Sequence, residues 1–185
     1  MAKQFSSIQE NQRDFILNQK MFFTASAAPH GRVNVSPKGL DTFRYINPNE
    51  VAYLDLTGSG NETAAHLKAS PDQRLTIMFC AFEDPPVILR LYGQGKVISS
   101  ESTQYQELSQ LFEAIPGARQ IIHLKIDLVQ TSCGYGVPLY EYQGQRPTLI
   151  KWAEAKGPGG LDAYRAEKNL FSIDGFPTGL KTTDV

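Results

Sequence analysis

Short runs of β-forming residues, separated by turn-forming residues, are the feature that most limits what this chain can fold into. The runs are rich in Val, Ile, Leu, Phe and Tyr, and Gly, Pro, Asn or Asp stands at their ends, as is typical of strands joined by tight connections. They cover residues 21–28, 32–36, 51–56, 74–82, 87–93, 96–99 and 120–132. So many short strands with hairpin-like connections favour an antiparallel barrel or sandwich over a parallel sheet.

Helical periodicity is found on either side of these strands. Ile8, Phe15 and Ile16 recur at helical spacing near the N-terminus, and residues 103–115 carry a second amphipathic pattern that stops at Pro116. Residues 161–169 read as a further helix, after a stretch rich in Gly and Pro. The sequence therefore predicts one domain of the mainly β class, in which residues 1–147 form a barrel with an N-terminal helix and residues 148–185 form a helical arm.

Composition excludes several functional classes. At 185 residues the chain is long enough for one domain with a continuous core. Lys plus Arg (18) nearly balance Asp plus Glu (19), so no strong positive field favours nucleic-acid binding. No stretch of about 18 apolar residues predicts a membrane span, and the expected location is cytoplasmic. The two cysteines and three histidines form no ligand pattern, so no metal site is predicted.

The stretch RVNVSPKG, residues 32–39, has an unusual alternation. Successive strand side chains point to opposite faces, so Asn34, Ser36 and Lys38 share one face and Val33 and Val35 the other. A lysine at the end of such a polar row can complement the charge of a phosphate group. The alternative is that Lys38 is an ordinary solvated lysine in a turn.

The stretch DLTGSGNETAAHL, residues 55–67, leads from a predicted strand into a predicted short helix. Its two glycines let the backbone approach a ligand closely, and the free N–H groups and dipole of a helix start favour an anion. Ser59, Asn61 and Thr63 add short polar side chains. The alternative is a capping box, in which Ser59 and Glu62 satisfy the backbone donors without a ligand. Neither GxxxxGK[ST] nor GxGxxG is matched, so a nucleoside triphosphate site is not predicted.

Taken together, the blocks resemble the FMN-binding split-barrel family related to pyridoxamine 5'-phosphate oxidase. The resemblance is carried, in order, by FFTASAAPHGRVNVSPKG, VAYLDLTGSGNETAAHL, RLTIMFCAF and VILRLYGQGKV. It implies a six-stranded antiparallel split barrel that forms a homodimer, with one FMN in each of two clefts between the subunits. The arm would then pack on its own barrel or on the partner subunit.

The resemblance also implies the site residues. The flavin would lie along residues 32–39, in contact with Asn34, Ser36 and Lys38, and Thr57 would lie on the cleft side of its strand end. Ser59, Asn61 and Thr63 would lie nearest the phosphate, with Arg44 or Arg90 as a candidate for a second cation. Trp152 would either stack on the flavin of the partner subunit or anchor the arm to the barrel, and both alternatives stay open.

The chain departs from the oxidases themselves in two places. Where those enzymes carry basic residues at the helix start, this chain has Asn61, Glu62 and Thr63, and it ends without their arginine-rich C-terminal signature. Vitamin B6 oxidation is therefore not predicted.

The resulting functional hypothesis is an FMN-dependent oxidoreductase that takes a hydride from NAD(P)H or a small substrate. No catalytic residue is predicted, because flavin chemistry belongs largely to the cofactor. One alternative is a protein that binds FMN or haem without turnover, and another is a structural dimer with an empty cleft.

Overall fold

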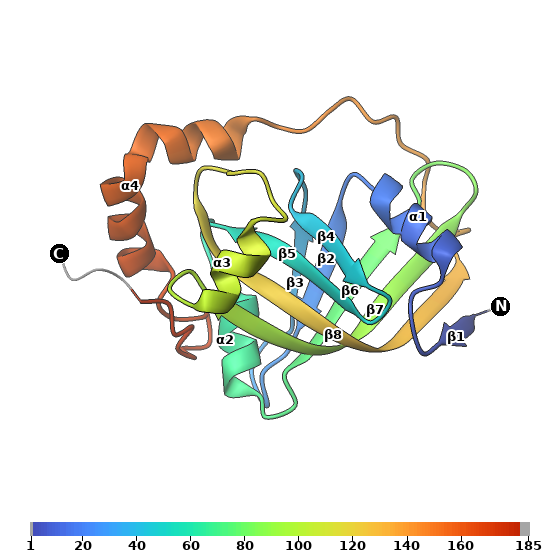
Figure 1. Cartoon of the computed structure of the whole chain (residues 1–185), viewed down its shortest axis with the longest axis horizontal. Helices are drawn as coiled ribbons and strands as arrows, with labels where there is room; N and C mark the ends of the chain where they lie inside the picture. Colours follow the sequence, from blue (N-terminus) through green and yellow to red (C-terminus); the bar gives the residue numbers. More distant parts are fainter. Residues whose placement is uncertain (1, 182–185) are drawn as a thin grey trace.

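The computed structural model describes residues 2–181, which form a single antiparallel sheet with helices around it (Figure 1). Within these residues the strands are β1 (Lys3–Phe5), β2 (Phe22–Ser26), β3 (Asn34–Lys38), β4 (Phe43–Asn47), β5 (Glu50–Leu56), β6 (Arg74–Cys80), β7 (Val87–Ser99) and β8 (Ala118–Cys133). The helices are α1 (Glu10–Asn18), α2 (Glu62–Ala69), α3 (Thr103–Ser109) and α4 (Thr148–Lys168).

The sheet curls into a barrel that stays open along one side. Its strand order is β3-β2-β6-β7-β8-β5-β4, and β1 adds to β8 outside this path. The end strands β3 and β4 do not pair with each other, yet Lys38 on β3 reaches Asp55 on β5, with 3.0 Å between Nζ and Oδ1. The two ends of the sheet therefore come together without closing, and the predicted mainly β split barrel with flanking helices is confirmed.

The strand count is eight rather than the six that the resemblance implied. Six of the eight correspond to the predicted runs, because residues 87–93 and 96–99 belong to one strand, β7, which continues through a bulge at Tyr92 and Gly93. A side chain at Gly93 would overlap the carbonyl oxygen of Lys125 on β8, so this glycine allows the close approach of two backbones. The short strand β1 and the half-buried strand β4 lack a clear alternation and were not predicted.

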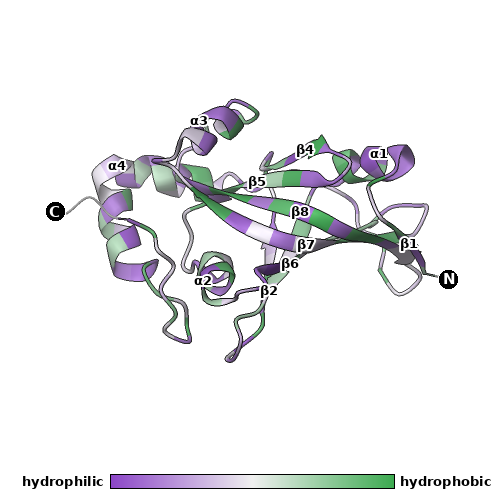
Figure 2. Ribbon diagram, turned by 60° about the horizontal axis from the view of Figure 1, so that its bottom comes forward, coloured by the Kyte–Doolittle hydropathy of each residue, from purple (hydrophilic) through white to green (hydrophobic). Residues whose placement is uncertain are grey.

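Two apolar clusters stabilise the barrel. The larger cluster fills its interior with side chains such as Tyr53, Phe79, Leu91 and Leu124, all buried. The smaller cluster lies on the outer face of β5, β7 and β8, where α3 covers Ala52, Ile98 and Ile121. Apolar and polar residues alternate in bands along these strands (Figure 2). Because α3 covers their outer face, the adjacent residues Ile121 and Ile122 are both buried.

Strand β3 turns its polar face inward. Asn34, Ser36 and Lys38 are half-buried, whereas Val33 and Val35 on the opposite face are 70% and 61% exposed. The predicted alternation is confirmed, and the sheltered face is the polar one. An apolar face on the end strand of a sheet is a candidate surface for association with another chain.

Residues 134–168 form the connection and helix that arch over the open side of the barrel (Figure 1). Helix α4 is kinked at Gly157, whose φ of 64° and ψ of 175° are accessible to glycine and rarely to other residues. Pro158 follows and suits the first turn of the second half of the helix, where its missing N–H is not needed. The kink turns this second half back toward α2.

Candidate functional site

A cavity of about 1340 Å³ lies between the open side of the barrel and the arm. Its volume exceeds the roughly 300–1,000 Å³ of typical small-molecule pockets. The barrel contributes residues 37–40 and the apolar side chains of Leu54 and Leu56. The connection before α4 contributes residues 140–146, and α4 contributes Trp152 and Tyr164. Gly58 and Ser59 line the cavity between these two walls.

Three of the eight predicted site residues face this cavity: Lys38, Ser59 and Trp152. The side chain of Lys38 is 23% exposed and ion-paired, so the alternative of a solvated turn lysine is wrong. Ser59 is exposed at the tip of its loop. The Trp152 ring lies edge-on to the Tyr164 ring, with 5.0 Å between the centroids, and both rings line the cavity. Trp152 therefore packs within the arm and faces the cavity as well.

The other five predicted residues do not line the cavity, and they bond to one another or to the rest of the chain. Asn34 Nδ2 donates to Thr63 Oγ1 (3.3 Å), and Ser36 Oγ donates to Asn34 Oδ1 (3.0 Å). Thr57 and Asn61 are buried. Contacts from these five residues to a ligand stay predictions.

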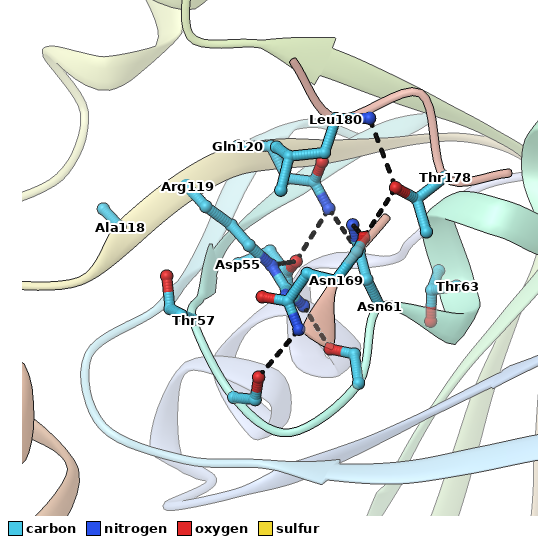
Figure 3. A network of polar contacts seen from close by, with 12 residues as sticks. Asp55, Thr57, Asn61, Thr63, Ala118, Arg119, Gln120, Asn169, Thr178 and Leu180 are labelled. Carbon is cyan, nitrogen blue, oxygen red and sulfur yellow. Dashed lines mark hydrogen bonds and ion pairs between the residues drawn. The ribbon is translucent and has the colours of Figure 1, made fainter. Parts of the chain in front are cut away.

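Asp55 is the centre of a buried polar network that links the barrel to this region (Figure 3). Its carboxylate accepts hydrogen bonds from Lys38 Nζ (3.0 Å), Arg119 Nε (2.8 Å) and Gln120 Nε2 (2.8 Å). Burial alone would raise the pKa of Asp55, but the charges of Arg119 and Lys38 outweigh it and hold this pKa well below its usual range. Asp55 is therefore ionised at neutral pH, and its negative charge partly neutralises the positive charge of Lys38.

The network also fixes the loop from Thr57 to Asn61, which we call the ligand loop. Arg119 Nη2 donates to the carbonyl oxygen of Gly60 (2.9 Å), and Gln120 Nε2 donates to Asn61 Oδ1 (2.8 Å). Thr57 Oγ1 donates to the Gly117 carbonyl oxygen (2.8 Å). Both ends of the ligand loop are thus tied to the first residues of β8 and the turn before them.

The start of α2 is not capped by the side chains that the sequence pattern suggested. Asn61 is the N-cap residue and its side chain makes no capping hydrogen bond. The carboxylate of Glu62 accepts the backbone N–H of Ile173 at 3.1 and 3.2 Å, so the capping box of Ser59 and Glu62 does not form and that alternative is wrong. An acidic side chain already occupies the first turn, where the helix dipole favours negative charge.

The two arginines beside the ligand loop are Arg119 and Arg165, which the sequence interpretation missed. The candidates Arg44 and Arg90 lie elsewhere: Arg44 pairs with Asp41, and Arg90 Nη1 donates to Ser132 Oγ (3.2 Å). The sequence feature that could have pointed to Arg119 is the pair of polar residues Arg119 and Gln120 at the start of a predicted strand.

Two kinds of feature are absent from the part of the chain that the structure describes. Among residues 2–181, no three His, Cys, Asp or Glu side chains gather closely enough to hold a metal ion. No helix in the same range is both long and apolar enough to cross a membrane.

Comparison with known proteins identifies a matching family and a similar protein that spans most of the chain. Residues 8–133 match the sequence profile of the family described as pyridoxamine 5'-phosphate oxidase. The pyridoxamine 5'-phosphate oxidase family protein ustO of Aspergillus flavus is 40% identical over 191 residues, which cover 94% of this chain and 76% of that protein.

Solved structures show the same fold at low sequence identity. A single-substitution variant of HupZ from Group A Streptococcus has a TM-score of 0.54 and 16% identity, covering 68% of this chain and 99% of that chain. A candidate pyridoxamine 5'-phosphate oxidase of Lactobacillus delbrueckii has a TM-score of 0.53 and 18% identity, covering 68% and 94%. From the matched profile and the 40% identical relative, this chain belongs to the pyridoxamine 5'-phosphate oxidase family.

Proposed function

We propose that this protein binds FMN in the cavity between the barrel and the arm, and that it is an FMN-dependent oxidoreductase. The observation that carries the proposal is that Lys38, Ser59 and Trp152, which are far apart in the sequence, line one cavity. Membership of the family supports a flavin as the ligand.

The residues around the cavity suit a planar ring with an anionic tail. Leu54, Leu56 and the Trp152 ring supply apolar and aromatic surface for the ring. A side chain built at Gly58 would meet no atom within 4 Å, so a ligand has room to approach this backbone. Lys38 lines the cavity and is linked to the ligand loop through Asp55 and Arg119, and we assign the phosphate to it.

The protein's own part in the chemistry is to bind and orient. Bound FMN supplies hydride transfer, while Lys38 and the ligand loop would hold its tail and Trp152 would cover its ring. We further propose a homodimer as the working unit, a cytoplasmic location, and NAD(P)H or a small molecule as the hydride source. Vitamin B6 oxidation is not proposed.

Binding of FMN without turnover is the second candidate. It is favoured by the ion pair between Lys38 and Asp55, because an internal carboxylate already neutralises much of the lysine's charge. The cavity wall is also balanced in charge, with Lys20, Lys38 and Arg146 against Glu83, Asp84 and Glu141. Such a site suits reversible binding of FMN, which a protein that stores or delivers the cofactor requires.

The first test is the absorbance spectrum of the purified protein, with mass analysis of any small molecule released on denaturation. We expect flavin bands and released FMN. Anaerobic addition of NADH or NADPH then tests turnover with a nicotinamide donor. Bleaching of the bands supports the oxidoreductase, and unchanged bands leave an oxidoreductase with a small-molecule donor or the non-catalytic protein. A colourless protein that does not bind added FMN rejects both.

Lys38→Met tests the assigned contact. Loss of one charge-assisted hydrogen bond is worth about 1.5–3 kcal/mol, so FMN affinity should fall roughly 10- to 150-fold. Trp152 is the only tryptophan, and quenching of its emission by added FMN gives the dissociation constant. Lys125→Met, on an exposed position of β8, is the matched control and should leave the affinity unchanged. Equal affinities of the wild type and Lys38→Met would rule out the role given to Lys38.

A further inference from the structure

The segment from Arg165 to Thr178, which we call the C-terminal segment, lies outside the residues matched by the family profile, yet it contacts the ligand loop. The profile ends at residue 133. Figure 3 shows Asn169 and Thr178 beside Asn61 and the buried Asp55 network. The C-terminal segment, which lies beyond the residues matched by the profile, therefore contributes contacts to the candidate site.

Asn169 makes the central contacts. It is fully buried, and its side chain bonds in two directions. Nδ2 donates to the carbonyl oxygen of Gly58 (3.0 Å), and Oδ1 accepts from Arg119 Nη1 (2.8 Å). One side chain therefore joins the ligand loop to the arginine that pairs with Asp55.

Arg165 holds the first residue of the ligand loop. Its Nε donates to Thr57 Oγ1 (2.9 Å), and its Nη2 donates to the Ala118 carbonyl oxygen (3.0 Å). An ion pair with Asp162, at 3.1 Å, fixes the guanidinium within α4. The planar fork of arginine makes these contacts at once, which a lysine cannot reproduce.

The C-terminal segment is also held in place by contacts of residues that follow Asn169 in the sequence. The Asn169 carbonyl oxygen accepts from Thr178 Oγ1 (2.7 Å), and Ile173 N–H donates to Glu62 on α2. Asp174 pairs with Arg32, just before β3. The segment is therefore held against the barrel independently of its contacts with the ligand loop.

We propose that Asn169 and Arg165 are positioning residues, which fix the ligand loop so that Gly58 and Ser59 face the cavity. The proposal rests on the proposed function, because it concerns FMN affinity. Neither residue lines the cavity. Glycines at positions 58 and 60 give a free loop many conformations, and fixing one of them before binding lowers the entropic cost of binding.

Asn169→Asp is the decisive variant. It is nearly isosteric and keeps an acceptor for Arg119, but it loses the hydrogen bond donated to Gly58. Asp174→Asn is the matched control, because it changes the same segment at a residue that does not touch the ligand loop. Without any ligand, hydrogen–deuterium exchange of a peptide covering residues 56–61 should quicken at least several-fold in Asn169→Asp and stay as in the wild type in Asp174→Asn.

The second measurement is the FMN dissociation constant from Trp152 emission, taken at a temperature where circular dichroism shows each variant fully folded. Under that condition a merely structural residue leaves the dissociation constant unchanged. Loss of one hydrogen bond predicts a roughly 5- to 10-fold increase for Asn169→Asp and less than a two-fold change for Asp174→Asn. Arg165→Lys should act in the same direction, and it replaces Asn169→Asp if that variant does not fold.

The outcomes separate this proposal from the proposed function. Unchanged exchange at residues 56–61 overturns the positioning role, and faster exchange with an unchanged dissociation constant overturns its effect on affinity. A wild type that binds no FMN overturns the proposed function and the affinity claim together. The exchange comparison, which needs no ligand, then decides whether the two residues position the loop.

Discussion

Asp55 couples stability to pH through its buried ion pairs. Its pKa in the folded protein lies below the value of about 3.9 in an unfolded chain, so the unfolded state takes up a proton first as the pH falls. The stabilisation is present above the unfolded value and is lost as pH falls below about 4 toward the folded value. We therefore expect the free energy of unfolding to decline below that pH.

Asp55→Asn should flatten this part of the pH profile. The variant should also be less stable at neutral pH, by about 3–5 kcal/mol, because Arg119 stays buried without its counter-charge. Urea unfolding at several pH values between 7 and 3 measures both effects. Parallel profiles for the wild type and the variant would contradict the assignment of the acid sensitivity to Asp55.

At this scale, the sequence revealed contacts that depend on local pattern. Alternation placed Lys38 on the polar face of β3, and the structure shows that this face is the sheltered one. It did not reveal the distant partners of Asp55 or Glu62, since Asp55 pairs with Arg119 across 64 positions and Glu62 bonds to Ile173 across 111. The local pattern suggested a capping box, but the Glu62 carboxylate instead accepts the backbone N–H of the distant residue Ile173.

Among the elements, helix α4 depends on one glycine for its direction. Gly157→Ala would force an alanine into a backbone region that costs about 1–3 kcal/mol, and we expect that loss in the free energy of unfolding. Gly159→Ala is the matched control, because this glycine lies in the second half of the same helix with open space around it, and alanine there should be stabilising by up to about 1 kcal/mol.

Urea unfolding of the two variants checks this expectation, and equal stability of Gly157→Ala and Gly159→Ala would show that the kink is not maintained by the glycine backbone. The kink also matters for the site, since Arg165 lies on the second half of α4 and reaches Thr57 from there. Gly157→Ala should therefore weaken FMN binding as well.

The observed boundaries of the strands match the predicted ones where the hydrophobic pattern and the turn residues agreed. Strands β2, β3, β5, β6 and β8 lie within a few residues of the predicted runs. The pattern failed where tertiary contacts decide: β7 continues through Gly93 and Gly95 because β6 and β8 pair along it, and α3 ends at Ser109, before the periodicity does. The split-barrel architecture came from the family resemblance rather than from local pattern, and the order of the strands within the sheet was not predicted.

For the whole molecule, the exposed apolar face of β3 leads to a prediction about association. Val35 lies on the end strand β3 and Val33 directly before it. The second edge of this strand is unpaired within the described sheet, which is where another chain can add. We commit to a second copy of this chain as the partner, because the family resemblance implies a homodimer. The large cavity beside β3 is consistent with a site completed by two chains.

The double variant Val33→Asp/Val35→Asp should sediment with the mass of one chain, whereas the wild type should sediment as two. Both side chains are exposed, so the substitutions should leave the fold intact, and the circular dichroism spectrum checks this. Leu17→Asp, at an exposed position of α1, is the control and should stay dimeric. A wild type that is strictly monomeric would contradict the homodimer. A double variant that remains dimeric would place the interface elsewhere. If the variant is monomeric and also loses FMN affinity, the two chains build the site together.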